Sequence, residues 1–156
     1  KIKGQNLAGA ASFMIGYDDA NGNGMAVNIE ASPFGIDMVG EDGGKLVHTN
    51  HILSEHLKKN VQDMNEFIFD DSLLRKKRAE QLINTQIRNQ QTITTEDFKR
   101  WFADQLNAPN SINHFENHLA PEHRRMETVF SIVMNLSKRK MEVCVGKPSE
   151  SHYEEV

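Results

Sequence analysis

The first third of the chain alternates apolar and polar residues with a period of two. Residues 10–17 are rich in small, β-branched and aromatic side chains, and residues 25–31 and 34–39 alternate regularly. A period of two is typical of β-strands that bury one face. The Asp, Asn and Gly cluster at 18–24 indicates a turn, and a short strand is expected at 45–48 after a second Gly-rich turn. The pattern therefore predicts an antiparallel, meander-like sheet.

The middle of the chain changes to a helical period. Apolar residues spaced three and four apart predict one helix over residues 71–89 and a second over residues 95–106. Thr94 stands three residues before Asp97, which is the spacing of a capping box at the start of the second helix. Pro109 ends that region, because proline has no N–H for a helical hydrogen bond.

The last third returns to alternation. Residues 128–136 and 141–145 alternate and are joined by a polar connection, so they predict a β-hairpin. Strands, then helices, then a hairpin indicate an α+β fold of antiparallel sheets with two main helices. No linker divides the chain. We therefore expect residues 1–156 to form a single domain or a C-terminal fragment of a larger one.

Composition and charge narrow the class of protein. The 156 residues include 18 Lys and Arg against 22 Asp and Glu, a formal net charge of −4, which argues against a general nucleic-acid binder. The mean hydropathy is −0.58, and no apolar run approaches the ~20 residues of a membrane span. The start at Lys1 lacks the apolar core of a signal peptide. We expect neither nucleic-acid nor membrane partners; the compartment is not identified, with the cytoplasm favoured.

The cysteine and histidine content points away from a metal site. The single cysteine, Cys144, excludes an internal disulfide, and its place in a predicted strand indicates a structural thiol. His48 and His51 are three residues apart, and His114 and His118 are four apart. No carboxylate stands where it would complete a zinc site with either pair. We therefore expect no metal and no cofactor.

One segment satisfies the pattern of a calcium loop. Asp19, Asn21 and Asn23 would supply oxygens, Gly24 the sharp turn and Glu30 a bidentate carboxylate. An EF-hand needs a helix on each side of the loop, whereas both flanks here are predicted to be strands. Asn-Gly pairs between alternating runs are typical of a hairpin turn. A hairpin turn is the favoured interpretation, and a calcium-binding loop over 19–30 is kept as an alternative.

The segment His48-Thr49-Asn50-His51 resembles the His-Thr-Asn-His segment of the penicillin acyltransferase family, which includes the isopenicillin-N acyltransferases. Further short blocks resemble the same family, in family order, across residues 9–148. They are residues 10–16 and 29–33, similar to the strand pair before that segment; Asp71-Ser72-x-x-Arg75-x-x-Arg78, similar to a helix start; and residues 128–133 and 143–148, similar to the final hairpin.

This resemblance implies an N-terminal-nucleophile (Ntn) hydrolase with an αββα sandwich fold. In that family the proenzyme cuts itself before a cysteine, which then attacks an amide or acyl-CoA substrate. The resemblance implies that Asn50 is catalytic, its side-chain amide donating to the oxyanion. It also implies that Arg125, with Arg124 beside it, binds substrate by pairing with a carboxylate, or pairs with an acidic residue near the nucleophile.

The family's nucleophile is not found in its expected place. It should precede Gly9, and Cys144 in the last strand cannot take an N-terminal role. We therefore expect the C-terminal portion of an acyltransferase or amide hydrolase whose nucleophile lies outside this chain, so that the isolated chain lacks Ntn activity. The alternative is a non-catalytic binding or interaction module of the same fold. Its exposed sheet edges would then pair with a second copy of the chain or with a missing N-terminal segment.

Overall fold

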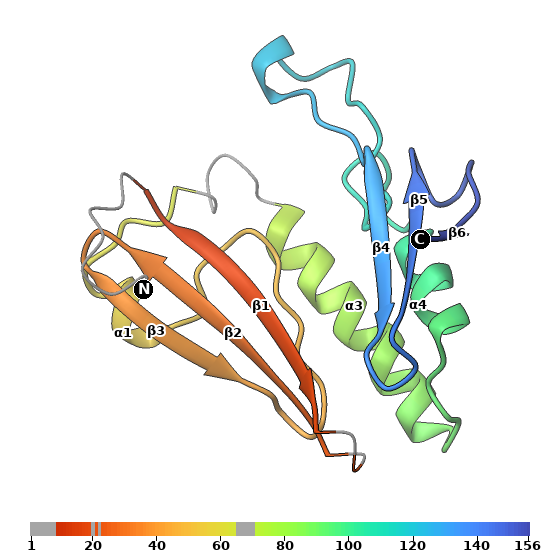
Figure 1. The fold of residues 1–156 in the computed structure, drawn as a ribbon. Coiled ribbons are helices and arrows are strands. Elements are labelled where there is room, and N and C mark those ends of the chain that lie inside the picture. Colours follow the sequence, from red (N-terminus) through yellow and green to blue (C-terminus); the bar gives the residue numbers. More distant parts are fainter. Residues whose placement is uncertain (1–8, 20, 22, 65–70) are drawn as a thin grey trace. The chain divides into compact units, whose positions relative to one another are not determined.

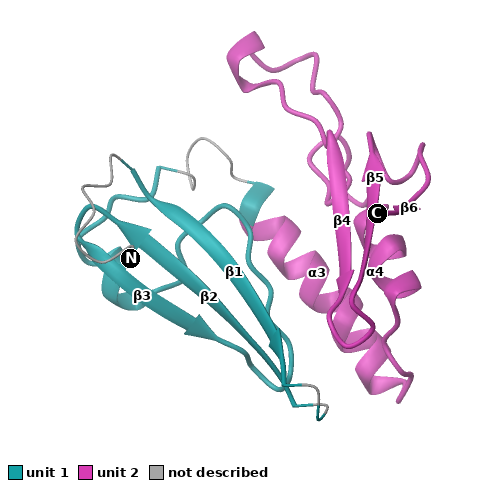
Figure 2. Ribbon diagram, viewed as in Figure 1, with its two compact units in different colours: residues 1–72 teal, residues 73–156 magenta. Residues whose placement is uncertain are grey.

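The computed structural model describes residues 9–19, 21, 23–64 and 71–156. The chain divides into two compact units, residues 1–72 and residues 73–156 (Figure 1, Figure 2). Each unit carries its own three-stranded antiparallel sheet. The α+β class predicted from the sequence is confirmed, with α3 and α4 as the two main helices.

Unit 1 is built on the predicted meander. Strands β1 (Ala11–Asp18), β2 (Gly24–Ser32) and β3 (Gly35–Gly40) pair antiparallel in the order β1-β2-β3. Asp18 pairs with Gly24, so β1 and β2 form a hairpin, as the favoured interpretation of this segment predicted.

The prediction of a strand over 45–48 is wrong, because no strand forms there. Gly43 and Gly44 adopt positive φ angles of 59° and 77°, a conformation that costs glycine little. The chain therefore turns so tightly that only an isolated bridge between Asp42 and Lys45 forms. Residues 46–49 then continue as a loop.

The two faces of the unit 1 sheet differ in chemistry. The register places Ser12, Glu30 and Asp37 in one row across the three strands, on a polar face. Phe13 pairs with Ile29 on the opposite face, which is apolar; Phe13 is 46% exposed. The short helix α1 (Glu55–Lys58) contacts β3 and buries Leu57. Its N-cap is Ser54, whose side chain accepts from the Leu57 N–H.

The two main helices begin where the sequence predicts. Helix α3 (Asp71–Arg88) matches the expected span closely. Helix α4 (Thr95–Phe102) starts with the predicted capping box between Thr94 and Asp97. It ends four residues earlier than expected, because the Asp104 side chain accepts from the Leu106 N–H and so favours a turn over another helical turn.

The second sheet contains the predicted hairpin and one strand more. Strands β4 (Phe130–Asn135) and β5 (Lys140–Val145) pair antiparallel, and β5 also pairs with β6 (Glu154–Glu155). A two-residue acidic strand has no alternation that could have predicted it. The 3₁₀-helix η1 (Glu122–Arg124) precedes β4. Among the described helices, none is long and apolar enough to cross a membrane.

Candidate functional site

A cavity of about 430 Å³, lined by both apolar and polar residues, lies within unit 1. Its walls come from the start of β1, the end of β2 and the loop after residue 47, and they include Ser12, Glu30, His48, Asn50 and His51. This volume lies within the usual range for small-molecule sites, roughly 300–1,000 Å³. The cavity therefore brings the His-Thr-Asn-His loop together with the polar face of the sheet.

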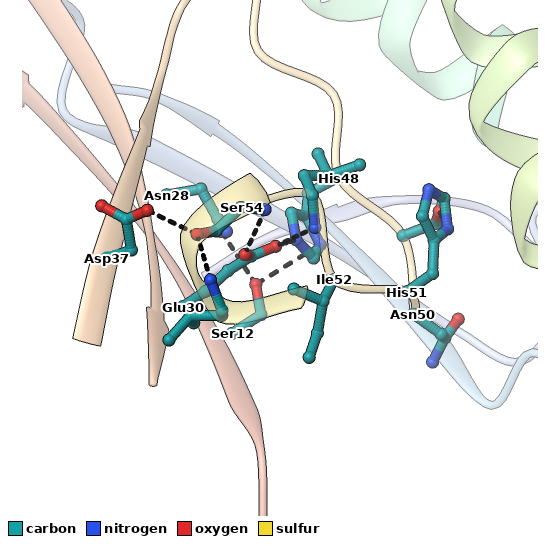
Figure 3. A network of polar contacts seen from close by, with 12 residues as sticks. Ser12, Asn28, Glu30, Asp37, His48, Asn50, His51, Ile52 and Ser54 are labelled. Carbon is teal, nitrogen blue, oxygen red and sulfur yellow. Dashed lines mark hydrogen bonds and ion pairs between the residues drawn. The ribbon is translucent and has the colours of Figure 1, made fainter. Parts of the chain in front are cut away.

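Glu30 is the centre of the polar contacts in this region (Figure 3). Its side chain is only 3% exposed, and Oε1 lies 2.6 Å from His48 Nε2. The backbone N–H of Leu53 donates to Oε1 at 2.7 Å, and that of Ser54 donates to Oε2 at 2.8 Å. Hydrogen bonds to a charged carboxylate are stronger than those between neutral groups. The Glu30 carboxylate therefore joins β2 firmly to both ends of the loop at 48–54.

Asp37 extends these contacts to the third strand. The Ser54 hydroxyl donates a short hydrogen bond to Asp37 Oδ2, and the Met38 N–H donates to Oδ1. The hydrogen bond from Ser54 is the main reason that the pKa of Asp37 lies below its usual value. Ser54 thus connects α1 with the carboxylates of both β2 and β3.

Ser12 and Asn28 lie beside the Glu30–His48 pair (Figure 3). Ser12 Oγ lies 2.9 Å from Asn28 Oδ1 and 3.4 Å from His48 Nδ1. Asn28 is completely buried, and its Nδ2 has no hydrogen-bond partner. The two nitrogens of the His48 ring therefore face a hydroxyl on one side and a carboxylate on the other.

The backbone of the His-Thr-Asn-His loop is held by Ser72 at the start of α3. Ser72 Oγ accepts from the N–H of Asn50 at 2.9 Å and of His51 at 3.2 Å. The Thr49 hydroxyl donates to the Ser72 carbonyl at 2.9 Å, and His51 Nδ1 lies 2.8 Å from Ser72 Oγ. Two of these contacts hold the backbone N–H groups of Asn50 and His51, and the others hold the side chains of Thr49 and His51.

Asn50 itself is exposed and lines the cavity. In Figure 3 its side chain points away from the contact between Glu30 and His48. A neutral amide at this place can donate two hydrogen bonds without titrating. Asn50 therefore has a fixed backbone and an accessible side chain.

Arg125 belongs to unit 2, whereas the cavity with Asn50 belongs to unit 1. Arg125 Nε donates to the carbonyl of Ala120 at 3.0 Å, and Nη2 donates to that of His118 at 3.3 Å. Nη1 lies 3.8 Å from Glu116 Oε1. These contacts tie the guanidinium to the loop that precedes it.

The structure keeps Glu30 apart from the other residues of the calcium alternative. Asp19 Oδ1 accepts from the N–H groups of Asn21 and Asn23, and Oδ2 accepts from Asn23 Nδ2, so this carboxylate closes its own turn. The hydrogen bond from the Asn23 side chain is the first cause that lowers the pKa of Asp19. Glu30 stands six strand residues beyond Gly24, about 20 Å away at the usual rise per residue. Among the described residues, no group of three or more acidic, His or Cys side chains is placed to hold a metal.

Sequence reasoning did not assign Ser12 and Ser72 a function, and it considered Glu30 only as a calcium ligand. Ser12 and Glu30 fall in blocks that resemble family strands, and Ser72 was expected only to begin a helix. One signal was available: Glu30 and Asn28 are polar residues on alternate positions of a strand whose other positions are apolar. A carboxylate in such a position is costly to bury without partners, so it points to a polar cluster.

Fold and site together define an α+β protein in which a His-Thr-Asn-His loop and the polar face of a sheet line one cavity. The chain belongs to the acyl-coenzyme A:6-aminopenicillanic acid acyl-transferase family, whose profile matches residues 3–150. The resemblance seen in the sequence is thereby confirmed, and acyl transfer is the kind of function that this family supports. Among curated proteins, none matches the chain significantly.

Proposed function

We propose that this chain contributes the oxyanion-stabilising part of an acyltransferase or amide hydrolase that acts on a small-molecule amide or an acyl-CoA. The family match over residues 3–150 carries the proposal. The nucleophile is an N-terminal cysteine, freed by autoproteolysis, from a segment outside these 156 residues. Cys144 does not fill this role, because it is completely buried in β5.

Asn50 is the proposed oxyanion donor. Its backbone is fixed by Ser72, and its side chain is exposed on a cavity wall, which suits a donor that must be in place before charge develops. The thiolate attacks the substrate carbonyl carbon, and the oxygen that becomes negative accepts from the Asn50 amide. Collapse of the intermediate expels the amine or thiol and leaves an acyl-enzyme, which an amine or water resolves.

Arg125 is the proposed partner of a substrate carboxylate. We assign this contact to the edge formed by Nη1 and Nη2; Nη1 is the nitrogen furthest from its present acceptor, 3.8 Å from Glu116 Oε1. Arginine suits the role because its planar guanidinium binds a carboxylate through two parallel hydrogen bonds. Replacement by lysine would keep the charge and lose that geometry.

The test is acyl transfer by the polypeptide that contains this chain together with its nucleophile. Asn50→Ala should lower kcat about 100- to 1,000-fold, as loss of one oxyanion donor does elsewhere. Gln62→Ala is the matched control, since Gln62 is another exposed amide that lines the same cavity. Equal activity of Asn50→Ala and wild type would overturn the role of Asn50. Absence of turnover in the wild-type polypeptide would favour a non-catalytic binding module.

A further inference from the structure

In unit 1 a hydroxyl, an imidazole and a buried carboxylate lie next to one another in space, with the imidazole between the other two. Ser12 Oγ lies 3.4 Å from His48 Nδ1, and His48 Nε2 lies 2.6 Å from Glu30 Oε1. We propose that Ser12, His48 and Glu30 form a second nucleophilic site, in which Ser12 accepts the acyl group of an activated ester or thioester. This site works independently of Asn50 and of any cysteine.

The carboxylate fixes the ring in the orientation that the chemistry needs. Glu30 is held by the N–H groups of Leu53 and Ser54, so its oxygens cannot turn away from the ring. With the Nε2 proton directed at Glu30, the Nδ1 of a neutral His48 carries a lone pair toward Ser12. The His48 side chain is 8% exposed, which limits competition from water for that lone pair.

The orientation of the Asn28 amide decides where the Ser12 proton points. With the amide oxygen toward Ser12, the hydroxyl donates to Asn28 at 2.9 Å, and the buried Nδ2 has no partner. With the amide turned by half a rotation, its nitrogen donates to Ser12 Oγ, and the hydroxyl donates to His48 Nδ1 instead. The second arrangement makes one more hydrogen bond from the same atoms. It is also the arrangement that activates Ser12.

Ser12 is placed where a substrate can reach it. Its residue is exposed at the start of β1, and it lines the cavity of about 430 Å³. Nucleophilic catalysis by serine requires an accessible hydroxyl next to a base that a third group orients. Here the hydroxyl faces the cavity, and the base and carboxylate are buried. The cavity limits the site to small acyl groups.

The proposed reaction has two steps. Ser12 Oγ bonds to the carbonyl carbon, its proton passes to His48 Nδ1, and the bond to the leaving group breaks; His48 returns the proton to the departing alcohol, phenol or thiol. Water then attacks the acyl-Ser12 ester and gives a proton to His48. The acid is released, and Ser12 Oγ recovers its proton.

The test treats the full chain with a fluorophosphonate probe and with p-nitrophenyl acetate. Peptide mapping by mass spectrometry should place one adduct on Ser12, and Ser12→Ala should lose it. His48→Gln keeps a donor for Glu30 without a base, and should lower the labelling rate about 100-fold or more. Ser137→Ala, which removes an exposed serine of unit 2, is the matched control and should label like wild type.

Each outcome decides the proposal. Labelling of Ser12→Ala at the wild-type rate, or no labelling of folded wild-type protein, would overturn it. Ser12 is exposed and its replacement leaves the Glu30–His48 pair intact, so a folded Ser12→Ala protein, checked by circular dichroism, is expected. Asn50→Ala should still be labelled at Ser12, which separates this proposal from the role assigned to Asn50.

Discussion

The hydroxyl oxygen of Ser72 lies 2.9 Å from the backbone nitrogen of Asn50. Because the same oxygen also accepts from His51, one side chain at the start of α3 satisfies two consecutive N–H groups of the cavity loop. Ser72 is only 1% exposed and His51 only 4%, so the N–H of His51 would be left buried without this acceptor if the Ser72 hydroxyl were removed. The position of Asn50 therefore depends on a residue that stands 22 positions later in the chain.

Ser72→Ala should destabilise the protein by about 1–3 kcal/mol, the usual cost of leaving buried donors unsatisfied. Urea unfolding followed by circular dichroism measures this change. Ser151→Ala removes an exposed serine and should leave the unfolding midpoint unchanged. A midpoint for Ser72→Ala equal to that of the control would show that the contact with Asn50 contributes nothing.

Glu30→Gln should destabilise unit 1 by about 1–3 kcal/mol, the usual cost of leaving buried hydrogen-bonding groups unsatisfied. Glutamine has nearly the same size, but its NH₂ group would face the N–H donors of Leu53 or Ser54. Differential scanning calorimetry should show a lower unfolding temperature. Glu55→Gln changes an exposed carboxylate paired with Lys58, and should leave that temperature unchanged. Similar temperatures for the two variants would contradict the prediction.

Most helices and strands of this fold can be predicted from the local pattern of apolar residues, whereas the residues of the site cannot. The helix over 71–88 and both hairpins repeat an apolar period that is visible in the sequence. The strand predicted at 45–48 fails because two glycines with positive φ turn the chain tightly, which no count of apolar positions detects. Helix α4 ends early because an aspartate competes for a backbone N–H.

The site is assembled by contacts between residues that are far apart in sequence. Glu30 meets His48 across 18 positions, and Ser12 meets it across 36. Neither pair forms a short motif, so local spacing carries no sign of them. Asn50 was predicted from the family segment alone, and its role stays a prediction.

Asp97 should make stability depend on pH in the acid range. The hydrogen bond from the Thr94 hydroxyl, followed by that from the Thr94 N–H, lowers the pKa of Asp97 below its usual 3.8. A carboxyl whose pKa is depressed on folding stabilises the protein above its unfolded pKa, and this contribution is lost as the pH falls through the folded pKa. The unfolding temperatures of wild type and Asp97→Asn should therefore differ most near about pH 6 and converge toward about pH 2.

The control for this pH series is Asp42→Asn. The Asp42 side chain is 96% exposed, so the difference between this variant and wild type should be small and constant with pH. A gap between wild type and Asp97→Asn that stays constant down to about pH 2 would show that the capping box does not depend on the charge of Asp97.

Cys144 should be slow to react with thiol reagents in the folded protein. It is completely buried in β5, and burial raises the pKa of its thiol, so both access and thiolate are limited. An aromatic disulfide reagent should modify it roughly 100-fold more slowly than in urea, the factor given by a local opening free energy of about 2.7 kcal/mol. Cys144→Ser combined with Val145→Cys moves the thiol to the neighbouring position, which is 77% exposed and faces the other side of the strand, and should react rapidly. Equal rates for the two thiols would mean that β5 opens as readily as an exposed strand, and would contradict the burial of Cys144.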